Sequence, residues 1–153
     1  MGTKNKIRVK SENEYVIEVN DKGDIISFDL TDFRMPAKLL NVYNQLENLT
    51  KKYEIKSEEI AKRKDKSVND YITQNQLDLI NITEEYYKEA RTILDEFLGE
   101  NACQKIFGDK NYMNMFDDLM SQLEPHFVKM GLNLQKLQKG LVKKYTKNEN
   151  ILK

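Results

Sequence analysis

The only cysteine and the only histidine of the chain, Cys103 and His126, are the first pair to consider for catalysis. A Cys–His mechanism requires a helix end or a basic setting that ionises the thiol, and a third residue that orients the imidazole. Cys103 instead belongs to the short segment 101–107, whose apolar residues would pack inward. We therefore expect Cys103 to be a small buried residue, and we expect His126 to lie at the surface or to cap a helix.

Neighbouring carboxylates are the second candidates, because paired acids can perform general acid–base catalysis. Three such pairs occur along the chain: Glu84 and Glu85, Asp95 and Glu96, and Asp117 and Asp118. Adjacent residues of a helix point about 100° apart, so these pairs do not converge on one substrate atom. One cysteine and one histidine also cannot form a tetrahedral zinc site without several carboxylates. We therefore expect no catalytic residue, no metal site and no cofactor.

The charge balance argues against a nucleic-acid partner. The chain has 25 basic and 25 acidic residues and a formal net charge of zero, whereas proteins that bind a phosphate backbone usually carry a basic surplus. Both ends are nevertheless basic, through Lys4, Lys6, Arg8 and Lys10 and through Lys136, Lys139, Lys143, Lys144, Lys147 and Lys153. No apolar run approaches the length of a membrane span, and residues 1–20 contain no apolar signal segment. The lone cysteine indicates a reducing cytosol.

The residues before position 32 alternate polar and apolar side chains and predict a β-hairpin. Residues 14–20 and 24–30 have this period of two, and Gly23 between them suits a tight turn. Ile7 and Val9 could add a third short strand. Because an isolated hairpin is marginal in water, we expect this one to pack on a helix or to pair with another chain.

Two long amphipathic helices are expected over residues 33–98, because apolar residues recur there at steps of three and four. Thr31 or Asp32 would cap the first helix, Ser67 or Asn69 would cap the second, and Gly99 would end it. The residues that we expect to form the core are Leu39, Tyr43, Leu46, Ile93 and Phe97.

Residues 99–145 are expected to form a C-terminal helical region, followed at 146–153 by a polar tail that we expect to be mobile. A longer helical segment begins near Asn111, and Pro125 within it predicts a kink or a break into two helices. The chain is therefore expected to be a single, mainly α (α+β) domain. It would have an N-terminal β-hairpin region over 1–32, followed by a bundle of about four to five helices.

An apolar stripe rich in methionine and phenylalanine begins at Met115 and continues through the proline. Its positions step by three or four: Met115, Phe116, Leu119, Met120, Leu123, Phe127, Met130, Leu134, Leu137 and Leu141. The stripe is either a core seam or an open groove for a partner, because methionine surfaces adapt to many sequences. Both interpretations hold if one edge is buried and the other is open. The candidate partner-binding residues are Met115, Phe116, Leu119, Met120, Leu123, Phe127 and Met130, and we expect Phe116→Asp or Met120→Asp to keep the fold and lose the partner.

Two blocks of the chain resemble a family of small tail assembly chaperones from long-tailed bacteriophages and prophages of Gram-positive bacteria. The first block is Ile26-Ser-Phe-Asp-Leu-Thr-Asp-Phe-Arg-Met-Pro-Ala-Lys-Leu-Leu40, which is similar to the hairpin-to-helix junction of that family. The second is Phe97-Leu-Gly-Glu-Asn-Ala-Cys-Gln-Lys-Ile-Phe-Gly-Asp109, followed by Met-Phe-Asp-Asp-Leu, Glu-Pro-His and Lys-Lys-Tyr elements. It resembles the helical C-terminal half, in which a Phe-Gly-Asp turn precedes a Met/Phe-rich helix. Together the blocks cover about two-fifths of the chain.

The resemblance implies a non-catalytic protein of the infected host cytoplasm that is absent from the mature virion. Such chaperones coat the long helical tape-measure protein and recruit tail-tube subunits to it, and self-association is a further expectation. An alternative is a structural or adaptor subunit of a phage particle or of a host regulatory complex, which would use the same helical face permanently.

Overall fold

The computed structural model describes residues 4–7 and 13–132 of the chain. Two strands, β1 (Glu14–Glu18) and β2 (Ile25–Asp29), form an antiparallel hairpin. The helices of the described part are α1 (Met35–Lys62), α2 (Gln74–Leu98), α3 (Ala102–Phe107) and α4 (Met115–Lys129). The predicted mainly helical α+β fold is therefore confirmed. The expected tail at 146–153 lies outside the described residues.

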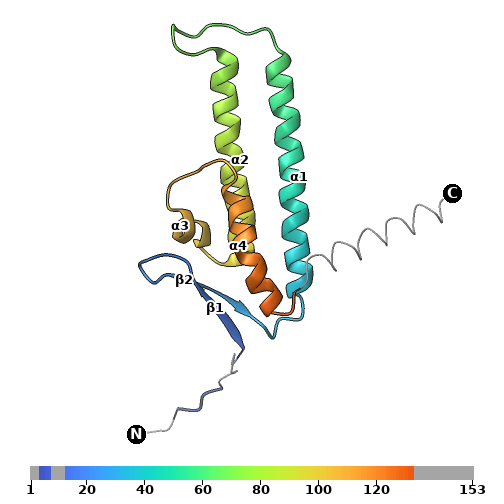
Figure 1. The fold of residues 1–153 in the computed structure, drawn as a ribbon, viewed down its shortest axis with the longest axis vertical. Coiled ribbons are helices and arrows are strands. Elements are labelled where there is room, and N and C mark those ends of the chain that lie inside the picture. Colours follow the sequence, from blue (N-terminus) through green and yellow to red (C-terminus); the bar gives the residue numbers. More distant parts are fainter. Residues whose placement is uncertain (1–3, 8–12, 133–153) are drawn as a thin grey trace, which may run out of the picture.

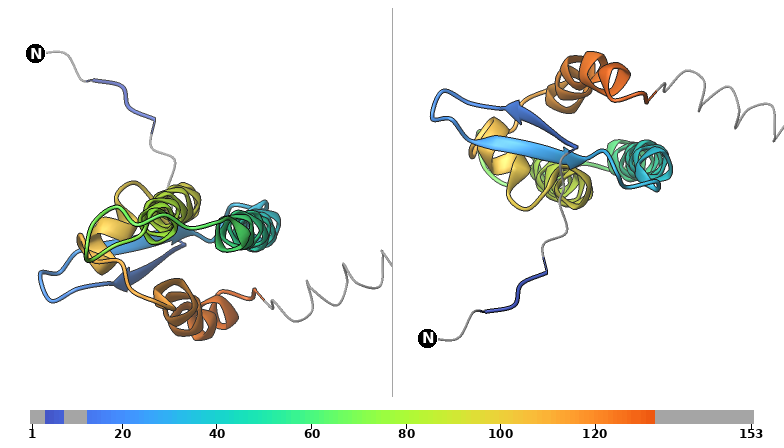
Figure 2. Two further views of the ribbon diagram at one scale, coloured as in Figure 1. Left: turned by 90° about the horizontal axis from the view of Figure 1, so that it is seen from above. Right: turned by 90° about the horizontal axis from the view of Figure 1, so that it is seen from below.

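Helices α1 and α2 form a long antiparallel pair, and the other elements lie against the half of this pair that is nearest the β-hairpin (Figure 1). Viewed along the pair, the β-hairpin lies between α2 and α3 on one side and α4 on the other (Figure 2). In this view α1, α2 and α4 lie at the three corners of a triangle. The β-hairpin fills the side between α2 and α4, and none of the described elements covers the side between α1 and α4.

The turn of the β-hairpin is closed by the side chain of Asn20. Its amide oxygen accepts hydrogen bonds from the backbone N–H groups of Lys22 (2.9 Å) and Asp24 (3.2 Å). Asparagine commonly organises turns in this way. Gly23 has a φ of 86°, a conformation that glycine adopts without steric cost. The predicted turn therefore forms, with Asn20 as the residue that organises it.

The β-hairpin packs on the helices through one face of β2. Ile26 and Phe28 are buried on this face, while Ser27 between them is exposed. The expected packing of the hairpin on a helix is confirmed. Residues 4–7 form no strand, so Ile7 does not extend the sheet, and Val9 lies outside the described residues.

Helix α1 begins after Arg34, whose side chain makes no cap hydrogen bond. Asp32 acts from two positions earlier: one carboxylate oxygen accepts the Arg34 backbone N–H at 3.0 Å, and the other lies 2.6 Å from Nζ of Lys38. The lysine contact is the main reason that the pKa of Asp32 falls to about 2. The prediction that Thr31 or Asp32 is the N-cap is wrong, because residues 29–32 still form a turn.

Helix α2 begins with a capping box. Thr73 accepts the backbone N–H of Gln76, and the Gln76 side chain accepts the backbone N–H of Thr73. The prediction of Ser67 or Asn69 as the cap is wrong, because both residues lie in a loop that folds back on itself. Ser67 pairs with Thr73 in an isolated bridge, and the Asn69 side chain accepts the backbone N–H of Ile72 at 3.0 Å.

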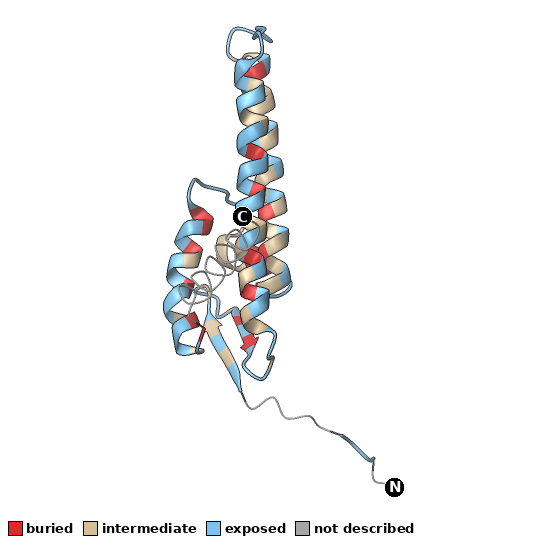
Figure 3. Cartoon of the chain, turned by 90° about the vertical axis from the view of Figure 1, so that its right-hand side faces the viewer, coloured by how far each residue is buried: buried red, intermediate tan, exposed pale blue. Residues whose placement is uncertain are grey.

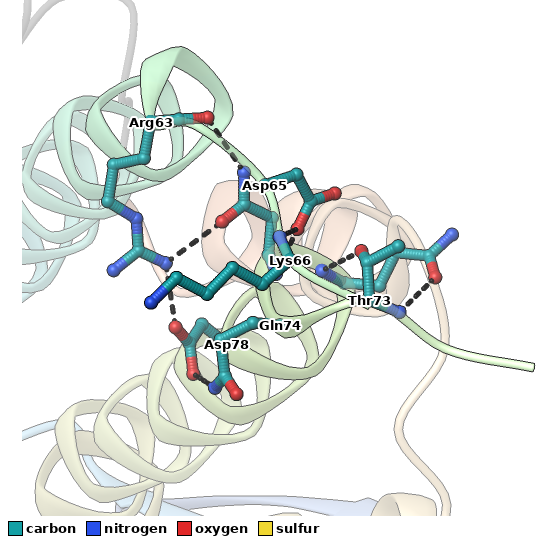
Figure 4. A network of polar contacts seen from close by, with 8 residues as sticks. Arg63, Asp65, Lys66, Thr73, Gln74 and Asp78 are labelled. Atoms are coloured by element: carbon teal, nitrogen blue, oxygen red, sulfur yellow. Dashed lines mark hydrogen bonds and ion pairs between the residues drawn. The ribbon is translucent and has the colours of Figure 1, made fainter. Parts of the chain in front are cut away.

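Polar contacts hold the tip of the α1–α2 pair together (Figure 4). The Arg63 guanidinium lies 2.6 Å from the Asp78 carboxylate. It also donates to the Asn75 side chain at 3.3 Å, and Asn75 returns a hydrogen bond to the Arg63 carbonyl. Asp65 accepts the backbone N–H of Asn75 at 3.1 Å. Hydrogen bonds and an ion pair therefore join the two helix ends.

Pro125 lies within α4, and the helix continues through it. Of the two predicted outcomes at Pro125, a kink or a break into two helices, the break does not occur. Proline leaves the carbonyl of Ser121 without its usual helical donor. Both residues are exposed, so water can bind to that carbonyl and the helix persists.

Gly131 ends α4 in a Schellman motif. Its φ is 83°, its N–H donates to the Val128 carbonyl at 3.0 Å, and the N–H of Leu132 donates to the Phe127 carbonyl at 2.8 Å. The predicted stripe from Met115 to Leu141 therefore does not lie on one uninterrupted helix, because Gly131 takes the left-handed conformation that ends α4. Leu134, Leu137 and Leu141 of the predicted stripe lie outside the described residues.

The core lies where α1, α2, α4 and the β-hairpin face one another (Figure 3). Phe28 of β2 contacts Phe97 of α2 and Phe127 of α4, with ring centroids 5.6 and 6.0 Å apart. Of the predicted core residues, Leu39 is buried. The others pack against the core with part of their surface exposed: Tyr43, Leu46, Ile93 and Phe97.

Replacing Phe28 with alanine should lower the free energy of unfolding by about 3–5 kcal/mol. The change removes a buried ring of β2 that packs against both α2 and α4. Urea unfolding followed by circular dichroism measures this loss. Val16→Ala on the exposed face of β1 is the matched control and should change stability by less than about 0.5 kcal/mol. Equal effects of the two changes would contradict the assigned packing of the hairpin.

Candidate functional site

A groove of about 770 Å³ lies between α1 and α4. Its apolar lining comes from Leu40, Tyr43, Leu46, Tyr86, Phe116 and Met120. Carboxylates line it as well: Glu47 from α1, and Asp117 and Glu124 from α4. The described residues that line it include no lysine, arginine or histidine, although Nζ of Lys51 lies 3.2 Å from the Glu47 carboxylate. The groove is therefore an apolar channel with acidic edges.

The aromatic cluster around Phe116 fixes the first turn of α4 against α2 and α3. The Phe116 ring lies 5.8 Å from the ring of Tyr87 and 6.3 Å from that of Tyr86. It also meets the Phe107 ring edge-on at 6.0 Å. Such edge and tilted contacts are favourable geometries for aromatic pairs. This packed aromatic cluster therefore forms the wall at one end of the groove.

At the other end, Tyr43 of α1 and Glu124 of α4 approach each other across the groove. Burial is the main reason that the pKa of Tyr43 is raised, and the nearby Glu124 carboxylate raises it further. A negative charge opposes ionisation of the phenol, so Tyr43 stays neutral and keeps its hydroxyl as a donor. The groove thus offers neutral and acidic partners to an incoming segment.

The seven candidate residues from the sequence separate into two groups. Met115, Phe116, Leu119, Leu123 and Phe127 are buried, with at most 8% of their surface exposed. Met120 and Met130 are partly exposed. Of these two, only Met120 lines the groove. The buried edge of the stripe is a core seam in this structure, and a contact between all seven residues and a partner stays a prediction.

The α1 side of the groove was missed by the sequence interpretation, which placed Tyr43 and Leu46 in the core. Both are only partly buried, because α4 lies beside α1 without closing over it. Tyrosine and acidic residues at the edge of an apolar face indicate such a half-open position. In the sequence only Glu47, next to Leu46, carried that signal.

Cys103 is buried in α3 beneath α2. Its backbone N–H donates to the Asp95 carboxylate at 2.8 Å, and its Sγ lies 3.7 Å from the Arg91 carbonyl. Burial, together with the Asp95 carboxylate, raises the pKa of the thiol to about 12. The expected small buried residue is therefore confirmed, and its thiol stays protonated at neutral pH.

His126 joins α4 to the β-hairpin. Its Nδ1 lies 2.8 Å from the Tyr15 hydroxyl, and the two rings meet edge-on with centroids 5.7 Å apart. The residue is half-buried and lies three residues before the end of the helix. The expected surface or capping position is wrong, because the β-hairpin packs over this turn of α4.

The acidic pairs do not assemble into a site in the described residues. Asp95 binds the backbone of Cys103, whereas Glu96 is exposed. Asp117 and Asp118 lie in the first turn of α4, where carboxylates interact favourably with the helix dipole. Within residues 4–7 and 13–132, no group of three or more His, Cys, Asp or Glu side chains is placed to hold a metal ion.

No helix of the described part has the length and apolar character needed to cross a membrane.

Comparison of the chain with protein-family models, with curated proteins and with solved structures finds no match.

Cys103 should react with maleimide about a thousandfold more slowly in the folded protein than an ordinary cysteine at pH 8, because the raised pKa leaves little thiolate. Mass spectrometry of the labelled chain measures the rate. The same chain in concentrated urea serves as the control and should label at the ordinary rate. Folded-state labelling within tenfold of the urea rate would show that the thiol is accessible and ionisable.

Proposed function

We propose that this chain is a non-catalytic tail assembly chaperone that holds a helical segment of a tape-measure protein in the α1–α4 groove. The observation that carries the proposal is the groove itself, which has an apolar lining between two antiparallel helices and is left open by the described elements. Amphipathic helices bind in such grooves through apolar residues spaced three and four apart.

The dimensions of the groove suit a short helix. Its α1 lining extends from Leu40 to Thr50, a length of about 15 Å along a helix. The lining positions of α1 recur at three- to four-residue steps, as do those of α4 from Phe116 to Glu124. A bound helix of about three turns would therefore contact both helices along its whole length.

The chemistry of the lining suits a client that presents varied sequences. Met120 has a flexible, polarisable side chain that adapts to different apolar neighbours. Glu47, Asp117 and Glu124 would favour client segments with lysine or arginine beside their apolar face. A long helical protein offers many segments of this kind.

The two blocks that resemble the chaperone family lie next to each other in the fold. Block 26–40 covers most of β2 and the start of α1, and block 97–109 covers the end of α2 and all of α3. Phe28 and Phe97 join the blocks through their rings, whose centroids lie 5.6 Å apart. Because the two blocks are adjacent, we extend the proposal to the other properties that the resemblance to the chaperone family implies. In that role the chain recruits tail-tube subunits, associates with itself and acts in the host cytoplasm, and it is absent from the mature virion.

A structural or adaptor subunit is the second candidate, and exposed apolar residues toward the tip of the α1–α2 pair favour it. Ile55, Val68, Tyr71 and Ile80 are all exposed there. A permanent interface would cover such residues. Mass spectrometry of purified particles separates the two roles, because a chaperone should be missing from them and a structural subunit should be present.

Met120→Asp should weaken binding of a co-expressed tape-measure fragment by tenfold or more, because it places a charge in the apolar lining. Affinity co-purification and titration calorimetry of the full chain measure the loss. Val128→Asp is the matched control, since Val128 is 63% exposed on the same helix and outside the groove.

The two variants should have the same circular dichroism and unfolding midpoint. Phe116→Asp is unsuitable as a test, contrary to expectation from the sequence, because Phe116 is buried among three aromatic rings and its replacement should unfold the chain. Unchanged fragment binding by a folded Met120→Asp variant would remove the groove as the client site.

A further inference from the structure

The α1–α4 groove continues past the start of α4 into a second hollow, which lies on the α1–α2 pair. This hollow has a volume of about 410 Å³ and shares Thr50 and Tyr86 with the groove. Its other lining residues come from α1 and α2: Tyr53, Glu54, Ser57, Glu58, Ile82 and Thr83. Figure 1 shows that α1 and α2 extend beyond the start of α4, so α4 does not cover this part of the pair. The groove and the second hollow therefore form one continuous channel, the long channel.

The floor of the long channel is apolar across the junction of its two parts. The Tyr86 ring contacts the Tyr53 ring edge-on in the second hollow, with centroids 5.7 Å apart, and the Phe116 ring in the groove at 6.3 Å. Ile82 lies one turn before Tyr86 on α2 and is half-buried. Rings from α1, α2 and α4 thus connect the two parts of the floor.

The length of the long channel is set by α1, which lines it from Leu40 to Glu58. This distance is about 27 Å along a helix, which a bound helix of about 18 residues, or five turns, would span. The first three turns would contact α1 and α4, as in the groove alone. The remaining turns would contact α1 and α2.

The edges of the long channel carry an excess of negative charge. The carboxylates that line it are Glu47, Glu54, Glu58, Asp117 and Glu124. Lys51 lies 3.2 Å from Glu47 and offsets its charge. The other four carboxylates are exposed, and none of the ion pairs between described residues includes them. The neighbouring Lys52 pairs instead with Glu89, outside the channel, at 3.5 Å.

We propose that the partner held in the long channel is a cationic amphipathic helix of about five turns, with lysine or arginine along the edges of its apolar face. Its apolar residues contact the floor from Ile82 to Met120, and its basic residues face the four carboxylates that lack a described partner. The proposal rests on the proposed function in taking the groove as a helix site. It adds the α1–α2 half of the site, and the length and charge of the bound segment.

Titration calorimetry of the full chain with a synthetic helix of about 18 leucine and lysine residues, leucine on one face, tests the proposal without a tape-measure fragment. One peptide should bind per chain. Glu54→Lys combined with Glu58→Lys should weaken binding about tenfold or more, because two attractions become repulsions. Glu59→Lys combined with Glu85→Lys is the matched control. It makes the same change in net charge at exposed positions outside the channel, and should weaken binding less than about threefold.

Met120→Lys tests the other end of the channel and should weaken binding of the same peptide about tenfold or more. All variants should keep the circular dichroism and unfolding midpoint of the parent chain. If Met120→Lys weakens binding while the two double variants behave alike, the bound helix ends near Thr50 and the proposal is overturned, with the α1–α4 groove left in place. Two peptides bound per chain, or equal binding of a helix with glutamate in place of lysine, would also overturn it.

Two measurements separate this proposal from a second copy as occupant and from the proposed function. In sedimentation of the chain alone, a dimer that the Glu54→Lys and Glu58→Lys changes dissociate would make a second copy the occupant and overturn the proposal. Peptide binding that responds to both ends of the channel, without binding of a tape-measure fragment, would support the proposal and remove the tape-measure client. Fragment binding without peptide binding would keep the proposed function and overturn the cationic helix.

Discussion

Three phenylalanine rings from three different elements meet at one end of the molecule, and their contact determines where α4 lies. Phe28 of β2 is 5.6 Å from Phe97 of α2 and 6.0 Å from Phe127 of α4, and Phe97 and Phe127 are 6.1 Å apart. Because the β-hairpin lies between α2 and α4 (Figure 2), these rings hold α4 on the far side of a strand layer. Helix α4 consequently packs beside α1 without closing on it, and the groove follows from that spacing.

The second fixed point of α4 is Phe116, which packs among Tyr86, Tyr87 and Phe107 at the other end of the helix. A helix held at both ends by buried aromatic rings can keep an open side without collapsing onto its neighbour. The acidic edges add to this effect, because the charged side chains of Glu47, Asp117 and Glu124 are exposed at the rim and resist burial. Glu47 is also paired with Lys51 at 3.2 Å. An open, rigid and acidic groove is the arrangement that a basic amphipathic helix can fill.

Local patterns in the sequence were sufficient for the β-hairpin, the two long helices, the end of α2 at Gly99 and the burial of Cys103. Each depends on neighbouring residues or on composition. The caps were harder to predict, because Ser67 and Asn69 are good capping residues that the loop before α2 uses for its own turn. The end of α4 was also hard to predict, because the apolar stripe continues past Gly131, whose left-handed backbone ends the helix.

The groove could not be predicted from the sequence, because its two walls come from segments about 70 residues apart. The stripe in α4 was visible, but nothing local indicates which of its edges the β-hairpin covers. His126 shows the same limit, since its partner Tyr15 lies 111 positions earlier in the chain. Periodicity identifies an apolar face, whereas the order of packing decides which part of that face stays open.

The central claim, that the α1–α4 groove binds a helix, is tested most directly by NMR of the full chain with labelled methionine methyl groups. The chain has six methionines; Met120 lines the groove, and Met113 is 81% exposed outside it. Addition of a tape-measure fragment should shift the Met120 methyl resonance and leave that of Met113 in place. A shift of Met113 alone, or no shift of Met120 at saturating fragment, would contradict the account.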